Sequence, residues 1–201
     1  MLRGVVEPCV TALRREAAHG RAGGLSWAGL LRGALRADRD RHRPARLAAE
    51  IIFDRGLGDL FVVRTAGHAM GPEVIGSIEY GVDVLDCPLV VVLGHDSCGA
   101  VGAACAAPED GMAPAGYIRD VVERGTPSVL AARAAGRVST EEILAEHMGD
   151  IVDLSLYRSR LLAERVAAGQ AAVVGLRYSL ADGTARLVAA RGLAMPVGSA
   201  L

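Results

Sequence analysis

The stretch Pro88–Val101, PLVVVLGHDSCGAV, decides the fold of this chain. It opens with five apolar residues, Leu89–Leu93, set between Pro88 and Gly94. A short apolar run with such boundaries is typical of a strand that is buried on both faces of a parallel sheet. The small residues that follow, Gly99–Gly102, predict the start of a helix. A buried strand that leads into a helix predicts an α/β fold.

Two side chains that can bind metal follow this strand directly. His95 and Cys98 stand three residues apart, just after the apolar run. Open α/β sheets place their sites at the carboxyl ends of the strands, so this pair lies where a site is expected. Imidazole nitrogen and thiolate sulfur are ligands that zinc prefers. Taken alone, however, the pair favours a buried structural thiol beside a capping histidine over a metal site.

The rest of the chain alternates between predicted strands and helices, which favours a mainly parallel sheet flanked by helices. Residues 46–201 form one predicted domain, and residues 1–45 form an N-terminal helical arm or linker in which Trp27–Ala37 carries apolar residues on one face. Asp182-Gly183 predicts a tight turn between two antiparallel strands. The predicted helices cover 48–54, 72–85, 99–107, 117–124, 129–135 and 140–168, and the predicted strands cover 59–64, 89–93, 171–180 and 184–190.

Composition excludes several classes of function. The net charge of the 201 residues is −1 with both signs interspersed, which argues against a nucleic-acid partner. No apolar run approaches the roughly 20 residues needed to span a bilayer, which argues against a membrane protein. The four cysteines lack the spacing of a disulfide scaffold, and Met1–Val6 lacks the pattern of a secretory signal. We therefore expect a cytoplasmic protein.

Three motifs resemble those of the β-class carbonic anhydrases. They are PLVVVLGHDSCGAV itself, GDLFVVRTAG at Gly58–Gly67 and SIEYG at Ser77–Gly81. The resemblance runs from about residue 46 to about residue 191 and implies the fold of that family. It also implies zinc-dependent interconversion of carbon dioxide and bicarbonate, with the metal held by two cysteines and one histidine. His95 and Cys98 match two of these three ligands.

One motif of the family is missing. The resemblance implies a Cys-x-Asp-x-Arg segment at the end of the first strand, in which the cysteine binds zinc and the aspartate accepts a hydrogen bond from zinc-bound water or hydroxide. Arg43-Pro-Ala-Arg46 stands in its place, directly before the helix predicted from residue 48. Arg46 matches the arginine of that motif, whereas the strand, its cysteine and its aspartate have no counterpart. About nine residues are absent, the length of one strand and its turn.

The missing ligand predicts an inactive member of the family, a pseudoenzyme. Loss of a thiolate weakens zinc binding, and loss of the aspartate removes the group that orients the hydroxide. We expect either zinc held weakly by His95 and Cys98 or no bound metal. Two alternatives stay open: a working carbonic anhydrase with a substitute third ligand, and a related hydrolase of carbon disulfide or carbonyl sulfide. Cys9 is the only cysteine upstream, but Thr11 stands where the motif requires aspartate.

The missing strand also bears on assembly. In the resembled family it lies between the strands at 59–64 and 89–93, so its loss predicts that these two pair directly or that Gly4–Val10 fills the slot. The family further implies a homodimer or a larger symmetric homo-oligomer, with the N-terminal arm crossing a partner. Scaffolding, regulation of an active paralogue, and binding of a small anion near Arg46, Arg64 and the helix start at Gly99 are the roles left open.

Overall fold

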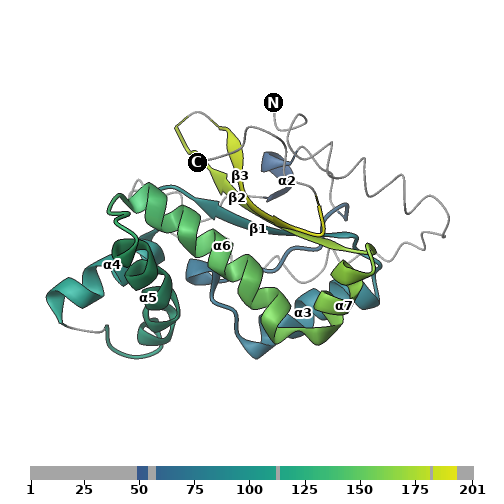
Figure 1. Ribbon diagram of the computed structural model, residues 1–201, viewed down its shortest axis with the longest axis horizontal. Helices are drawn as coiled ribbons and strands as arrows, with labels where there is room; N and C mark the ends of the chain where they lie inside the picture. The colour runs from purple at the N-terminus through teal and green to yellow at the C-terminus, as the bar shows by residue number, and fades with distance from the viewer. Residues whose placement is uncertain (1–48, 54–57, 112–113, 182, 194–201) are drawn as a thin grey trace.

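The computed structural model describes residues 49–53, 58–111, 114–181 and 183–193. In this part of the chain a three-stranded sheet carries most of the helices on one face, and α2 (Ala49–Ile52) lies on the other (Figure 1). The predicted α/β fold is confirmed, and the predicted arm at 1–45 lies outside the described residues. The helices of the larger layer are α3 (Pro72–Asp83), α4 (Gly99–Asp110), α5 (Ile118–Ala134), α6 (Thr140–Arg158) and α7 (Arg160–Ala167).

The sheet contains β1 (Leu89–His95), β2 (Ala172–Tyr178) and β3 (Ala185–Arg191), in the order β1-β2-β3. β1 pairs with β2 in parallel, so that Leu89 lies opposite Ala172 and His95 opposite Tyr178. β2 pairs with β3 antiparallel, as the turn signal predicts. The strand at the centre of the described sheet is therefore β2.

β1 is only half-buried, which corrects the prediction of a strand buried on both faces. Gly94 is its single buried residue, whereas the first five residues of β2 are all buried. No described strand pairs with the outer side of β1. An apolar run indicates that a strand packs in the interior, but its position within the sheet decides how much of it is covered.

Asp59–Arg64 forms no strand, so the predicted strand there and its direct pairing with β1 are both wrong. A strand persists only where a neighbour takes up its backbone hydrogen bonds, and no described segment does so here. Phe61 packs instead on α3, with its ring 6.3 Å from that of Tyr80. The alternative prediction, Gly4–Val10 in the slot, lies outside the described residues.

Two helix predictions are also corrected. α5 runs unbroken through Pro127, where the sequence predicts two short helices, because buried Val122 and Val129 hold one face in the core. The helix predicted over 140–168 ends at Arg158 and restarts as α7. The backbone at Ser159 is extended, and its hydroxyl accepts a hydrogen bond from the Leu162 amide, which caps the new helix.

The two faces of the sheet differ in how they are covered. Val90 and Val92 point toward the helix layer, where they join clusters that contain Met148, Val152 and Leu162. The opposite face carries Leu89, Val91 and Leu93, against which Phe53 and Leu193 pack among the described residues. One face of the sheet is thus deeply packed, and the other has little described cover.

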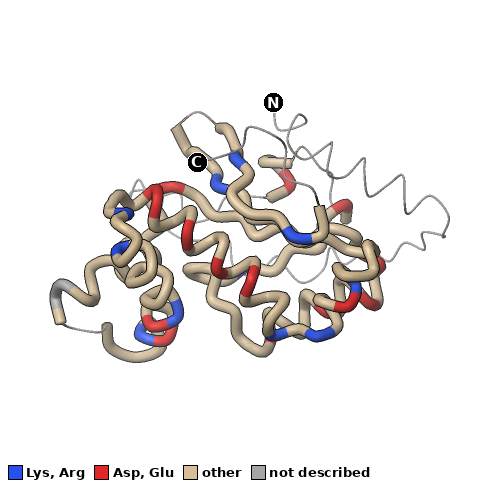
Figure 2. Tube along the Cα trace, viewed as in Figure 1, with Lys and Arg blue, Asp and Glu red and all other residues tan. Residues whose placement is uncertain are grey.

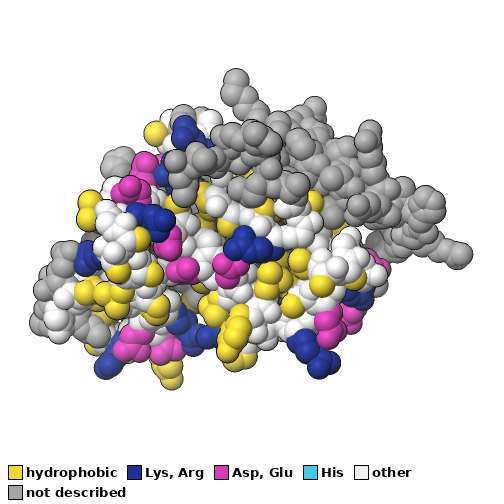
Figure 3. Space-filling model, in the orientation of Figure 1, with side chains coloured by type: hydrophobic (Ala, Val, Ile, Leu, Met, Phe, Trp, Pro, Cys, Tyr) yellow, Lys and Arg dark blue, Asp and Glu magenta, His cyan; other side chains and the backbone are white. Residues whose placement is uncertain are grey.

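Charge is distributed without a dominant patch. Acidic positions follow one another along α6, and three of them pair with arginines from other segments (Figure 2). Hydrophobic side chains reach the surface between the charged ones (Figure 3). The mixture agrees with a net charge of −1. None of the described helices has the length and apolar character needed to cross a membrane.

Candidate metal site at the carboxyl end of β1

His95 is the last residue of β1 and lies at the carboxyl edge of the sheet. Its Nδ1 lies 2.7 Å from the carbonyl oxygen of Asp96. A carbonyl oxygen only accepts hydrogen bonds, so Nδ1 carries the proton and Nε2 of the neutral ring keeps its lone pair. A metal binds neutral imidazole through such a lone pair. The ring therefore has the tautomer that a ligand at Nε2 requires.

Cys98 immediately precedes α4 and is 9% exposed. Its thiol is free of any disulfide, and it packs with Val101 and Ala104 in the core beneath α4. The turn from His95 to Cys98 is tight, since Ser97 has a positive φ of 56°. Both predicted ligands thus lie at the same edge of the sheet, one on each side of a short turn.

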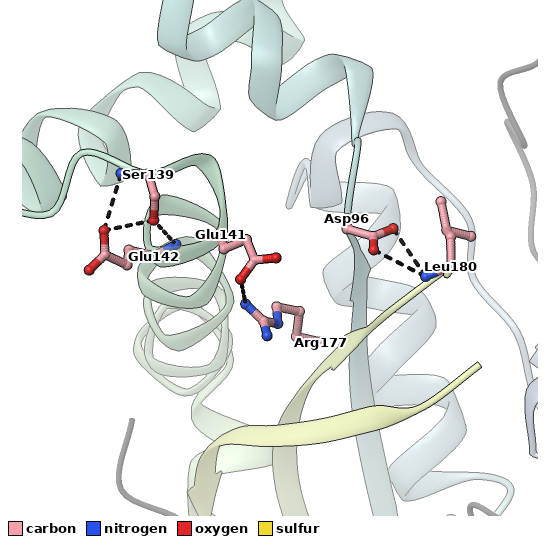
Figure 4. Close-up of polar contacts among 6 residues, drawn as sticks. All are labelled: Asp96, Ser139, Glu141, Glu142, Arg177 and Leu180. Carbon is pink, nitrogen blue, oxygen red and sulfur yellow. Dashed lines mark hydrogen bonds and ion pairs between the residues drawn. The ribbon is translucent and has the colours of Figure 1, made fainter. Parts of the chain in front are cut away.

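Asp96 anchors that turn to the neighbouring strand. Both of its carboxylate oxygens accept hydrogen bonds from the Leu180 amide at 3.1 Å (Figure 4). Its own amide donates to the carbonyl oxygen of Tyr178, also at 3.1 Å. The turn is therefore held to the end of β2, and the carboxylate serves as a backbone anchor.

The same view shows the start of α6, which has a capping box formed by Ser139 and Glu142. The Ser139 hydroxyl accepts a hydrogen bond from the Glu142 amide at 3.2 Å, and the Glu142 carboxylate accepts one from the Ser139 amide at 3.1 Å (Figure 4). The Ser139 hydroxyl also donates to the Glu142 carboxylate at 2.7 Å, and this bond, followed by the one from the Ser139 amide, lowers the pKa of Glu142 below its usual value. The amides of Ser139 and Glu142, which have no partner within the helix, are both hydrogen-bonded in this way. The capping box therefore defines where α6 begins.

The two predicted ligands do not make a complete zinc site with any other described residue. A catalytic zinc ion takes three protein ligands and keeps one open position. Within the described ranges, no three His, Cys, Asp or Glu side chains come together in a group that could hold a metal. His95 and Cys98 remain as two donors, while Asp96 is engaged by Leu180. Arg46 and Cys9 lie outside the described residues.

Two further histidines, His68 and His147, lie close to the end of β1 that carries His95. The Nε2 of His68 donates a hydrogen bond to the carbonyl oxygen of Leu93, at 2.9 Å, and its buried Nδ1 has no partner among the described residues. The ring of His147 lies 5.6 Å away between centroids. His147 donates from Nε2 to the Gly67 carbonyl at 3.1 Å and accepts at Nδ1 from Ser128 at 3.0 Å.

Burial keeps this histidine pair neutral. Burial, followed by the nearby His147, lowers the pKa of His68 from 6.5 to about 4. Burial likewise lowers the pKa of His147. Both rings therefore act as neutral hydrogen-bonding groups at neutral pH. They hold the 3₁₀ turn η1 (Ala66–His68) against β1, α5 and α6.

Neither histidine is predicted from the sequence to belong to a site. His147 falls on the buried face of α6 with Leu144, Met148 and Ile151, and that spacing could have predicted a buried, hydrogen-bonded ring. His68 offers no such signal. Its contact with Leu93 joins segments that are 25 residues apart in the sequence, and only the folded chain brings them together.

Comparison with known proteins assigns this arrangement to a family. Residues 44–185 match the family model described as carbonic anhydrase. Over 143 residues the chain is 57% identical to carbonic anhydrase 2 of Mycobacterium tuberculosis, which covers 71% of this chain and 69% of the relative. The chain belongs to the carbonic anhydrase family. A carbonic anhydrase of Mycolicibacterium smegmatis is 54% identical, with the same coverage of both chains.

Solved structures place this carbonic anhydrase family member in the β class by fold. The β-carbonic anhydrase CcaA superposes with a TM-score of 0.62 at 18% identity, over 92% of this chain and 82% of that one. The Coccomyxa β-carbonic anhydrase in complex with acetazolamide gives 0.59 at 19% identity, with the same coverage. A tetrameric β-carbonic anhydrase of Sordaria macrospora gives 0.59 at 18% identity, over 70% of this chain and 73% of that one.

Proposed function

We propose that this carbonic anhydrase family member is a pseudoenzyme that acts through assembly and not through hydration of carbon dioxide. The observation that carries the proposal is Arg43-Pro-Ala-Arg46, which stands where the family has Cys-x-Asp-x-Arg. Hydration requires a metal that lowers the pKa of water from 15.7 to about 7. With His95 and Cys98 as the remaining ligands, the ion binds weakly, and no aspartate orients its hydroxide.

Apolar surface supports a role in assembly. Leu89, Val91 and Leu93 lie on the sheet face with little described cover. On the helix layer, Tyr117 and Tyr157 are 93% and 88% exposed. Surfaces of this kind mark sites of protein–protein contact. We therefore propose a homodimer or a larger symmetric homo-oligomer, with an active paralogue as a further partner, in the cytoplasm, where its cysteines stay reduced.

Metal content and hydration rate, measured on the same preparation, test the proposal. We expect zinc well below one atom per chain by elemental mass spectrometry and no hydration above buffer by stopped flow. Cys98→Ser and His95→Ala should remove the residual zinc without changing the oligomer measured by light scattering. Stoichiometric zinc, together with hydration that Cys98→Ser abolishes, would overturn the proposal.

An active zinc enzyme is the second candidate, and the tautomer of His95 favours it. The Nδ1 bond to Asp96 leaves Nε2 available for a metal, as a working ligand requires. A third donor would then come from outside the described residues. His42 precedes Arg46 by four positions, the spacing between cysteine and arginine in the family motif, and Cys9 is the other choice. Loss of both bound zinc and carbon dioxide hydration in His42→Ala, but not in Cys9→Ser, would identify the ligand and establish this candidate.

A further inference from the structure

The histidines within the described residues carry their protons on different ring nitrogens. His68 and His147 each donate a hydrogen bond from Nε2 to a backbone carbonyl. His95 instead donates from Nδ1 to the carbonyl oxygen of Asp96, at 2.7 Å. In an unconstrained neutral histidine the Nε2–H tautomer predominates, so the ring of His95 is held in the less common form. Its bond to the Asp96 carbonyl therefore selects the tautomer.

The carbonyl that selects this tautomer belongs to a strained turn. Asp96 is followed by Ser97, whose φ of 56° lies in the left-handed region and costs free energy in a residue that has a Cβ. The bond from His95 depends on the direction of the one peptide plane between Asp96 and Ser97. Rotation of this plane would relieve Ser97 and would turn the carbonyl away from the ring. The turn therefore needs support from outside it.

Asp96 provides that support through two contacts with the chain at the end of β2. Its carboxylate accepts from the Leu180 amide at 3.1 Å through both oxygens (Figure 4). Its amide donates to the carbonyl of Tyr178, the last residue of β2, also at 3.1 Å. The carboxylate contact joins segments that are 84 residues apart in the sequence. Asp96 is thus held at its side chain and at its amide, and only its carbonyl faces the ring of His95.

We propose that Asp96 is a positioning residue that sets the tautomer of His95 through the anchor of its carboxylate on the Leu180 amide. The anchor keeps the Asp96 carbonyl on Nδ1, so that Nε2 keeps its lone pair at the carboxyl edge of the sheet. The turn between β2 and β3 thereby decides which ring nitrogen of His95 can accept. The proposal concerns the ring itself, and it holds whether or not the protein hydrates carbon dioxide.

NMR of the histidine ring nitrogens in the full-length chain tests this proposal. The chain is first dialysed against a chelator, so that no metal selects the tautomer, and is measured at about pH 8, above the usual pKa of histidine. We expect the Nδ1–H form to predominate for His95. His68 and His147 should show the opposite form, Nε2–H, and they serve as internal references.

Two variants at Asp96 separate the anchor from the charge. Asp96→Ala removes the acceptor for Leu180, and we expect the ratio of Nδ1–H to Nε2–H in His95 to fall by about fivefold or more. Asp96→Asn keeps an oxygen that can accept from Leu180, and its ratio should stay within about twofold of the parent chain. Hydrogen exchange of the Leu180 amide should be about tenfold faster in Asp96→Ala and nearly unchanged in Asp96→Asn.

Several outcomes would overturn the proposal. In the parent chain, either an Nε2–H ring at His95 or an unprotected Leu180 amide would do so, even if Asp96→Ala fails to fold. Unchanged signals of His68 and His147 show that Asp96→Ala is folded. If Leu180 then exchanges freely while His95 keeps Nδ1–H, the anchor does not set the tautomer. Equal losses of Nδ1–H in Asp96→Asn and Asp96→Ala would assign the effect to the charge of Asp96 and not to the anchor.

Discussion

His68 donates a hydrogen bond from Nε2 to the carbonyl oxygen of Leu93, at 2.9 Å, on the edge of β1 that no described strand covers. His68 has a positive φ of 55°, a conformation that costs free energy in any residue other than glycine. The bond therefore holds a strained turn against the strand that carries His95.

Replacement of His68 tests this bond directly. His68→Ala leaves the Leu93 carbonyl without its side-chain donor and keeps a Cβ in a left-handed conformation. We expect a loss of about 1–3 kcal/mol in the free energy of unfolding, measured with urea. His68→Asn should lose less than half as much, since asparagine accepts positive φ and provides an amide donor. Equal stabilities of the two variants would refute this role.

Acid should destabilise the protein through the same ring. The pKa of His68 is lowered to about 4 in the folded chain from 6.5, so the unfolded chain binds more protons between these values. Stability is complete above about pH 6.5 and falls as the pH drops toward 4, by roughly 3 kcal/mol from this group. Urea unfolding at pH 7.5 and pH 5 measures the slope. His68→Asn should show a shallower slope, and an unchanged one would contradict the assignment.

Gly94 should not tolerate a side chain. A Cβ at this position would lie 2.6 Å from the Sδ of Met148 and 3.3 Å from the Cδ1 of Leu144, both of which are buried. We expect Gly94→Ala to cost about 1–3 kcal/mol by overpacking. Gly149→Ala, where the added Cβ meets nothing within 4 Å, should be neutral or stabilising because alanine favours the helix.

A double-mutant cycle separates overpacking from a backbone effect at Gly94. Met148→Ala removes the atoms that the new Cβ would meet, so Gly94→Ala should cost less in that background than in the parent chain. Thermal unfolding of the four proteins measures the difference. The same cost in both backgrounds would show that Met148 is not the cause.

Ser159 should be the more sensitive of the two serine caps. Its hydroxyl accepts from the Leu162 amide at 3.0 Å and donates to Glu79 at 2.7 Å, in a position that is 1% exposed. Ser159→Ala leaves a buried amide and a carboxylate without this partner, and we expect a loss of about 1–3 kcal/mol. Ser139→Ala, at the exposed cap of α6, should lose less in the same thermal unfolding measurement. The reverse order would contradict this account.

The sequence by itself determined the elements whose signals are local. The apolar run before Gly94, the periodic helix over 72–85 and the turn at Asp182-Gly183 each specify their structure through neighbouring residues, and α3, β1, β2 and β3 lie where these signals predict. It also located His95 and Cys98 at the end of β1, because a strand end can be seen from the chain alone. The family resemblance that its motifs carry is confirmed.

Only the tertiary structure decided the features that depend on a distant partner. Asp59–Arg64 has the composition of a strand and forms none, because strand formation needs a neighbour that local sequence cannot supply. β1 is half-buried because it lies at the edge of the described sheet. His68 reaches Leu93 and lies beside His147 only after the chain has folded. Hydrogen bonding and burial between remote segments, which no local pattern encodes, set all three outcomes.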